Sequence, residues 1–325
     1  MKQARVWIVL IIGLLAMTTL AQQPGAPAPG TAPAAGAAGQ RGGRGAQTPE
    51  QQAAAFALRQ AQMAAEVRPI DAIDSVWIER LTVLEVRDFI KAGKTTGIIA
   101  TGGVESNGPH LASGKHNFVL QQTAEAVARK LGNALVAPIV TLEPYRTDQP
   151  VGIGNWVGLS QATYKSVLYD MGDSMRAMGF KNIIYIGDSG GNQTGMKQAA
   201  DELEAKYKGS PSHFYMIPEY YDYKSCQIYL QSVLKVPEKI EFGASNGSDG
   251  IHEEYCIDSL MALTDPETIR YEQRVKAGRG SINGASLLPL SSLLENGKLT
   301  RDLRAKLTVD AINKVLGAQK ASNQQ

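Results

Sequence analysis

The feature that most constrains the fold of this chain is an alternation of amphipathic stretches with short apolar runs between residues 82 and 217. Each amphipathic stretch ends at a glycine, and an apolar run starts a few residues later. Glycine is the residue that most easily adopts the left-handed conformation found at helix ends. Helices alternating with short strands predict an α/β fold with a mainly parallel sheet, covered by helices on both faces.

The boundaries of these elements follow from local signals. Thr82 and Glu85 form the capping box of a first helix, which stops at Gly93. The expected strands are 96–101, 134–140, 182–186 and 213–217. The helices expected after the first are 117–131, 161–178, 193–208 and 251–263.

The N-terminus has the order of a secretory signal peptide. Lys2 and Arg5 precede an apolar run over 6–15, and small and polar residues follow up to Ala21. That run is shorter than the roughly 20 apolar residues a membrane-spanning helix needs, although an uncleaved anchor is the alternative. We expect residues 1–21 to be removed and the chain to be exported, either to the periplasm or out of the cell. After cleavage we expect no attachment to a membrane.

Residues 22–66 are rich in Gly, Ala, Pro and Gln, a composition that buries too little surface to offset its ordering entropy. We interpret them as a disordered linker, and residues 67–320 as one α/β domain. The net charge of +2 is too small to favour nucleic acid as a partner. Cys226 and Cys256 are the only cysteines, which excludes a disulfide scaffold and a four-cysteine zinc site. The two could pair, but we expect separate buried thiols.

Three loops at expected strand ends hold most of the unusual chemistry. In parallel sheets, ligands bind beyond the carboxyl ends of the strands. Histidines and carboxylates that meet there from separate strands are ligands for a divalent transition metal. The loops are 102–117, 187–192 and 248–254, with Glu105, His110, His116, Asp188, His252, Glu253 and Glu254. His213 begins a strand far from these loops and is expected to be structural, and Asp249 has the position of a helix N-cap.

Two of the loops resemble one protein family. Residues 105–111 read Glu-Ser-Asn-Gly-Pro-His-Leu, similar to the Glu-x-His-Gly-Pro-His-Leu signature of the creatininase family. Residues 184–192 resemble that family's strand followed by Asn-Gly-His-Gly-Gly-Asn, and a weaker similarity extends over 81–263. The resemblance implies a three-layer α/β/α sandwich, commonly assembled as hexamers, that uses two metal ions to cleave cyclic or linear amides.

The chain departs from the family pattern at metal-binding positions. Glu105 falls on a family metal ligand, and His110 on the second histidine of the signature. Asn107 replaces the first histidine, which is also a ligand. His116 stands where the family has an aspartate ligand, and Ser189 where it has a histidine ligand.

A rearranged ligand set would still hold a metal. Glu105, His116 and Asp188 provide two carboxylates and one imidazole for one or two ions, zinc or manganese. Such an ion lowers the pKa of a bound water toward ~7. The proton for the leaving nitrogen would come from His252, Glu253 or Glu254. The alternative is that these are ordinary loop residues around a lost metal site.

The residues expected to bind the small-molecule substrate surround the same loops. They are Asn107, His110, Ser189, Asn192 and Trp156. Trp156 or Tyr145 could stack on a flat substrate, or fill a contact between subunits. Together these features predict a homo-oligomeric metal-dependent amidohydrolase that cleaves a C–N bond of a small amide or lactam.

Two other functions fit parts of the sequence. Residues 187–191 also match Gly-x-Ser-x-Gly, the turn that presents the nucleophile of serine hydrolases. Ser189 would then act with His252 and with Asp222 or Asp249. The third possibility is a non-catalytic protein that binds a small molecule on the same scaffold.

Overall fold

A computed structural model describes residues 48–145, 155–243 and 247–322. The chain divides into two compact units, Met1–Ala61 and Gln62–Gln325. The predicted signal peptide and most of the predicted linker lie outside the described residues. No helix in the described ranges combines the length and apolar character that spanning a membrane requires.

The last part of the predicted linker is helical. Helix α1 (Pro49–Ala65) has no buried residue. Its sequence is rich in alanine and glutamine, which have high helix propensity, so it can be helical without contributing to a core. The linker over residues 22–66 stays a prediction, with a helix in its last part.

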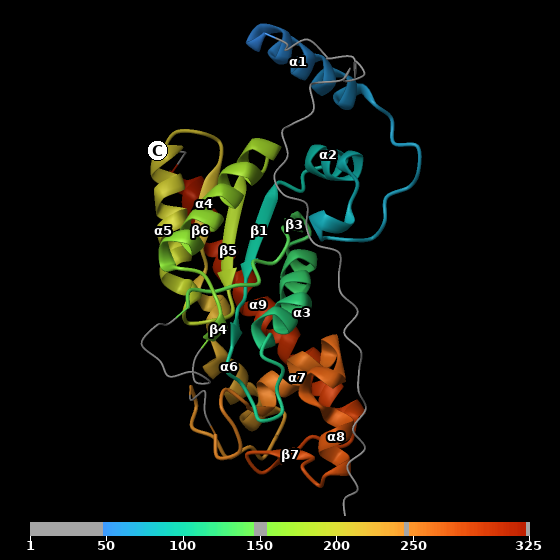
Figure 1. Cartoon of the computed structure of the whole chain (residues 1–325), viewed down its shortest axis with the longest axis vertical. Coiled ribbons are helices and arrows are strands. Elements are labelled where there is room, and N and C mark those ends of the chain that lie inside the picture. The colour runs from blue at the N-terminus through green and yellow to red at the C-terminus, as the bar shows by residue number, and fades with distance from the viewer. Residues whose placement is uncertain (1–47, 146–154, 244–246, 323–325) are drawn as a thin grey trace, which may run out of the picture. The chain divides into compact units, whose positions relative to one another are not determined.

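A four-stranded parallel sheet forms the centre of the second unit, as predicted. Its strand order is β3-β1-β5-β6 (Figure 1), and Ile98 of β1 pairs with Val136 of β3 and Ile184 of β5. The strands are β1 (Thr96–Thr101), β3 (Ala134–Val136), β5 (Asn182–Gly187) and β6 (His213–Met216). Strand β3 is shorter than predicted, but Val140 still forms a parallel bridge with Thr101.

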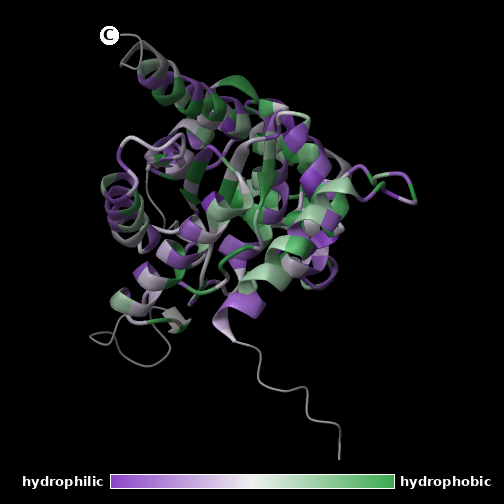
Figure 2. Cartoon of the chain, turned by 90° about the horizontal axis from the view of Figure 1, so that it is seen from above, coloured by the Kyte–Doolittle hydropathy of each residue, from purple (hydrophilic) through white to green (hydrophobic). Residues whose placement is uncertain are grey.

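Helices cover both faces of the sheet. On one face, α3 (Lys115–Leu131) and the long α9 (Leu290–Ser322) enclose a core that includes Ile98 and Ile312. On the other face, α4 (Gln161–Met178) and α5 (Asn192–Lys206) pack against the sheet with α2 (Val83–Lys91). Figure 1 shows α3 and the pair α4 and α5 on opposite sides of the strands. Figure 2 shows the strands as the hydrophobic centre. The fold is the predicted α/β/α sandwich.

The remaining elements are short. They are β2 (Val104–Glu105), β4 (Asn155–Val157), β7 (Ser281–Ile282), β8 (Ala285–Ser286), α6 (Tyr223–Ile228), α7 (Tyr255–Thr264), α8 (Tyr271–Lys276), a π-helix at Tyr229–Val233, and 3-10 turns at Ile78–Arg80, Pro218–Tyr221 and Pro266–Ile269. Helices α6, α7 and α8 share a separate apolar core, which contains Cys226 and Cys256. Both cysteines are free and buried, as expected.

Helix α7 begins later than predicted. The sequence placed its start at Ile251 and gave the N-cap to Asp249, but Glu254 is the residue at the N-cap. His252 adopts a left-handed backbone conformation with a φ of 53°, which interrupts a helix at that point. Asp249 instead accepts a hydrogen bond of 2.6 Å from the backbone nitrogen of Asn283.

The order of the strands positions the functional loops. The chain leaves β1 toward β3 on one side and leaves β5 toward β6 on the other. The carboxyl ends of β1 and β5 are therefore the switch point of the sheet, where α/β proteins bind ligands. Thr101 and Gly187 are paired at this edge, and the loops that follow them carry Glu105 and Asp188.

Candidate metal centre

His116 lies at the centre of the switch point. It belongs to the first turn of α3 and is 3% exposed. Its Nε2 atom is 2.8 Å from Oε1 of Glu105, and its Nδ1 atom is 2.8 Å from Oδ2 of Asp188. His116 is thus in contact with the other two residues predicted as metal ligands, Glu105 and Asp188, which lie on opposite sides of its imidazole ring.

Glu143 joins this cluster from a third strand end. It follows Val140, which bridges β1, and its carboxylate is buried. One oxygen, Oε2, accepts a hydrogen bond from the Ser189 hydroxyl. Ligand atoms of Glu105, His116 and Glu143 all lie within 4.8 Å of one another, and no other such group of three occurs in the described ranges. This set differs from the predicted one because Glu143 replaces Asp188.

Asp188 has its own partners on the side away from Glu105. Its carboxylate is fully buried, 2.6 Å from Nη2 of Arg304, and it accepts a hydrogen bond of 2.9 Å from the Tyr223 hydroxyl. Burial opposes ionisation, but Arg304, His116 and Tyr223 together hold the pKa of Asp188 below its usual value. A carboxylate on the second ring nitrogen fixes the orientation of a metal-binding histidine.

Glu105 is surrounded by positive groups. Oε1 is 2.8 Å from Nζ of Lys115 and 3.3 Å from Nδ1 of His252. Burial opposes ionisation here too, but His116, Lys115 and His252 hold the pKa of Glu105 far below its usual value. For His116, burial and Lys115 disfavour the charged ring, yet hydrogen bonds to Asp188 and Glu105 outweigh them and raise its pKa. A metal on Nε2 therefore has to displace a proton.

An unsatisfied oxygen indicates where a cation fits. Oε1 of Glu143 is buried and accepts no hydrogen bond from any described residue. A buried acceptor without a partner is costly, and burial also raises the pKa of this carboxyl group. A Cβ atom at Gly103 would lie 2.5 Å from Oε1, and one at Gly191 would lie 3.0 Å from Oε2. The two glycines thus leave room for the carboxylate beside His116. Two carboxylates and one imidazole fit zinc or manganese.

The three predicted proton carriers have different surroundings. Glu253 is fully buried and forms an ion pair of 2.9 Å with Arg274, and its Oε1 is 3.3 Å from Nδ1 of His110. His252 contacts Glu105, and burial together with the charge of Lys115 lowers its pKa. For Glu254, burial raises the pKa to about 8. Glu254 therefore holds its proton at neutral pH.

A cavity of about 220 Å³ lies beside the cluster. Its lining consists of Lys115, His116, Tyr221, Asp222, Tyr223, Lys224, Gly243, His252, Glu254 and Ile257. The cavity therefore exposes the imidazole of the metal cluster and the candidate acid to the same small space.

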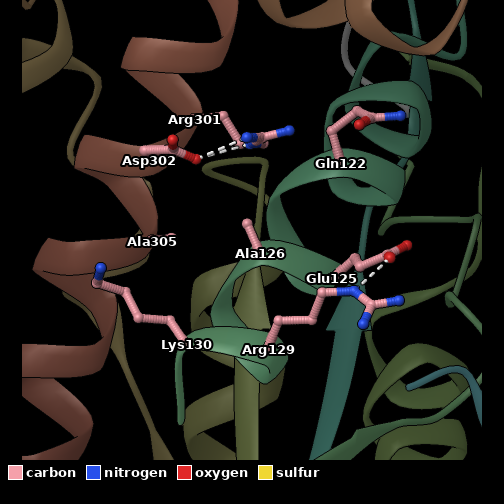
Figure 3. Close-up of a pocket in the computed structure, with 8 residues that line it drawn as sticks. All are labelled: Gln122, Glu125, Ala126, Arg129, Lys130, Arg301, Asp302 and Ala305. Carbon is pink, nitrogen blue, oxygen red and sulfur yellow. Dashed lines mark hydrogen bonds and ion pairs between the residues drawn. The ribbon is translucent and has the colours of Figure 1, made fainter. Parts of the chain in front are cut away.

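A larger hollow of about 540 Å³ lies between α3 and α9 (Figure 3). Four of its charged side chains are paired: Arg301 with Asp302 at 2.8 Å, and Arg129 with Glu125 at 2.7 Å. None of the described residues that line this hollow is a histidine or a serine. We therefore place the functional site at the smaller cavity.

Most of the predicted substrate-binding residues have structural hydrogen bonds. Asn107 donates to the backbone oxygens of Glu105 and Ser113, and so shapes its own loop. Asn192 is fully buried and joins the two loops, because it accepts from the Ser189 nitrogen and donates to the Gly102 oxygen. These contacts leave the two asparagines as supports of the site.

Two other aromatic or imidazole side chains predicted to contact substrate are not among the described residues that line the cavity. His110 contacts Glu253, and Tyr145 is 47% exposed. Trp156 lies in β4, but the placement of its side chain is outside the described part of the structure. His213, expected to be structural, lies on the edge strand β6, and its Nδ1 atom is 2.9 Å from Oε1 of Glu204 on α5.

The serine triad is not assembled. The hydroxyl of Ser189 donates to Glu143 and accepts from the Gly191 nitrogen. Nδ1 of His252 instead lies 3.2 Å from the Ser106 oxygen. Asp222 caps α6 through the Ser225 nitrogen, and Asp249 binds Asn283. Among the described contacts no histidine is hydrogen-bonded to Ser189, so the activating base of that mechanism is not in place.

The sequence did not identify four residues of this site. They are Glu143, Lys115, Tyr223 and Arg304. Glu143 had a detectable signal, since it follows the strand that pairs with β1 and so lies at the same edge. Arg304 had none, because it is 116 residues from Asp188 in the sequence.

Fold and cluster together define a class: doubly wound α/β proteins with carboxylates and imidazole gathered at the switch point of the sheet. Within this class the chain belongs to the creatininase family. The family model described as creatinine amidohydrolase matches residues 79–305, more than half of the chain. The family consists of amidohydrolases, which act on C–N bonds.

Solved structures of creatininase share the fold. A creatinine amidohydrolase (creatininase) structure is 17% identical, with a TM-score of 0.52, and the match covers 76% of this chain and 98% of that one. A tryptophan-to-phenylalanine mutant creatininase and a glutamate-to-glutamine mutant of "Zn-Zn type" each reach a TM-score of 0.54 at 17% identity, covering 74% of this chain and 98% of theirs. A further similar structure is named "Creatininase Mn". No curated protein matches the chain.

Proposed function

We propose that this protein is a metal-dependent amidohydrolase that cleaves a C–N bond of a small amide or lactam. The observation that carries the proposal is Glu143, which has a buried oxygen without a hydrogen-bond partner among the described residues and a ligand atom within 4.8 Å of those of Glu105 and His116. A divalent ion held by these three residues would supply an activated water and polarise an amide carbonyl.

The surrounding residues keep the three ligands in place. Asp188 holds the Nδ1 side of His116, so that Nε2 faces Glu105. Ser189 fixes one oxygen of Glu143 and leaves the other for the ion. Preorganised ligands of this kind avoid the cost of rearrangement during the reaction.

Glu254 is the proposed proton donor to the leaving nitrogen. It lines the same cavity as His116, and burial keeps it protonated at neutral pH. Cleavage of an amide requires such a donor, because an unprotonated nitrogen is a poor leaving group. His252, beside Glu105, is the proposed partner that positions that carboxylate.

The cavity limits the size of the substrate. A volume of about 220 Å³ suits a small molecule, and Tyr221 and Tyr223 provide flat apolar surface on its wall.

We further propose that residues 1–21 direct export to the periplasm or beyond, and that the domain assembles as a homo-oligomer.

The test is hydrolysis of a panel of small amides and lactams by the full chain, before and after chelation. Glu143→Gln should lower kcat/KM at least about 100-fold, since the ion loses one of its three ligands. Glu204→Gln is the matched control, because Glu204 also pairs with a histidine but lies on α5 beside β6. Activity that survives both chelation and Glu143→Gln would refute the proposal.

A further inference from the structure

Lys115 is a buried cation immediately beside the metal cluster. It is the first residue of α3 and is 5% exposed. Its Nζ atom is 2.8 Å from Oε1 of Glu105, and among the described residues Glu105 is its one ion-pair partner. A lysine is seldom buried unless a charged partner compensates it. The ammonium is thus a fixed part of the cluster.

The ammonium and His116 share one carboxylate oxygen. Nε2 of His116 and Nζ of Lys115 are each 2.8 Å from Oε1 of Glu105. A carboxylate that joins two metal ions accepts two positive centres in this way. Here His116 and Glu143 have ligand atoms within 4.8 Å of that of Glu105, whereas Lys115 already supplies a positive charge at the shared oxygen.

The remaining ligands do not suffice for a second ion. Apart from His116, the metal-binding side chain in contact with Glu105 is His252. No second group of three histidine, cysteine or carboxylate ligands occurs in the described ranges. A divalent ion close to the buried ammonium would also be repelled strongly, because the surroundings screen charge poorly.

We propose that the Lys115 ammonium takes the place of a second metal ion, so that each chain binds a single divalent ion. This inference rests on the proposed function and adds the number of ions. It sets the chain apart from the similar creatininase structure described as "Zn-Zn type".

The test is the zinc content of the full chain after equilibrium dialysis against a slight excess of zinc. The wild type should retain one ion per chain. Lys115→Glu should retain two, because a carboxylate at this position, together with Glu105 and His252, completes a second set of ligands. Circular dichroism shows whether the variant is folded.

Lys115→Met provides a second test, which does not require a second metal site to form in the variant. Removal of the charge should leave one ion per chain, bound at least about tenfold more tightly, since the repulsion is lost. Lys224→Met is the matched control, because Lys224 lines the same cavity without contacting Glu105, and its zinc affinity should equal that of the wild type.

The outcomes separate the two proposals. Two ions in the wild type, one ion in folded Lys115→Glu, or an unchanged affinity in Lys115→Met would each overturn the role of Lys115 and leave the metal-dependent function standing. No ion in any variant would overturn the proposed function itself.

Discussion

Asp188 and Arg304 form a fully buried ion pair that joins the end of β5 to the C-terminal helix α9. Nη2 of Arg304 is 2.6 Å from Oδ1 of Asp188, and the guanidinium lies 4.2 Å and 4.3 Å from the ring centres of Tyr220 and Tyr223. Since Asp188 also binds His116, a residue on α9 controls the orientation of the imidazole in the metal cluster. The position of the C-terminal helix is therefore coupled to the site.

Arg304→Met should destabilise the protein by about 3–5 kcal/mol, because it leaves the charge of Asp188 buried without its partner. Urea denaturation measures this loss. Arg304→Lys should recover only part of it, since an ammonium does not reproduce the planar guanidinium. A loss below about 1 kcal/mol for the methionine variant would contradict the importance of the pair.

Gly103→Ala should lower metal affinity at least about tenfold while the protein remains folded. A Cβ at this position would lie 2.5 Å from Oε1 of Glu143 and so would push the carboxylate away from His116. Zinc titration with a competing chelator measures the change. Gly317→Ala, on an exposed part of α9 with nothing near its Cβ, should leave affinity unchanged. Equal affinities in both variants would argue against Glu143 as a ligand.

Ser189→Ala should reduce kcat by less than about tenfold. The hydroxyl orients Glu143 and forms no hydrogen bond to a histidine in the described part of the chain, so we expect it to support the site without forming a covalent intermediate. Steady-state kinetics on any amide that the protein hydrolyses gives the answer. Complete loss of turnover with unchanged metal content would instead establish the serine mechanism.

The stability contributed by Glu254 should fall as the pH rises. Its pKa is raised from 4.5 to about 8, so between these values the folded chain holds a proton that the unfolded chain releases. Unfolding then becomes easier with rising pH. Glu254→Gln cannot ionise and should escape this loss. The Tm of the variant minus the Tm of the wild type should therefore rise by about 3 °C or more between pH 5.5 and 8.5. A constant difference would show that Glu254 is ionised throughout.

The same group should shape the pH dependence of activity. Since Glu254 is the proposed donor, kcat should decline as the pH passes about 8, where its proton is lost. Glu254→Gln should reduce kcat at least about 100-fold at pH 7, because an amide cannot donate the proton. A pH profile that keeps its alkaline limb in a still active glutamine variant would assign that limb to another group.

The sheet and its covering helices could be predicted well from the sequence, because the glycines that end the helices and the apolar runs that form the strands are local signals. The start of α7 was misplaced because the left-handed conformation of His252 depends on the loop around it and leaves no sequence pattern. The helix over residues 49–65 could not be expected from apolar periodicity, which this stretch lacks, because alanine favours helix without any core.

The site was partly predictable. Glu105, His116 and Asp188 follow from strand ends, which meet at one edge of a parallel sheet, and the structure places them in contact. Glu143 could have been found by the same reasoning, since it follows the strand that pairs with β1, whereas Arg304 could not, because its position depends on the packing of α9. Contacts between residues so far apart in the chain carry no local signature.

We expect one ion to lie between Glu105, His116 and Glu143. Anomalous diffraction at the zinc edge, from crystals of the zinc-loaded protein, tests this most directly. A single peak should lie within about 2.0–2.2 Å of Nε2 of His116 and of an oxygen from each of the two glutamates. A peak at Asp188 that Glu143 does not contact, or no peak in a catalytically active crystal, would contradict this assignment of the ligands.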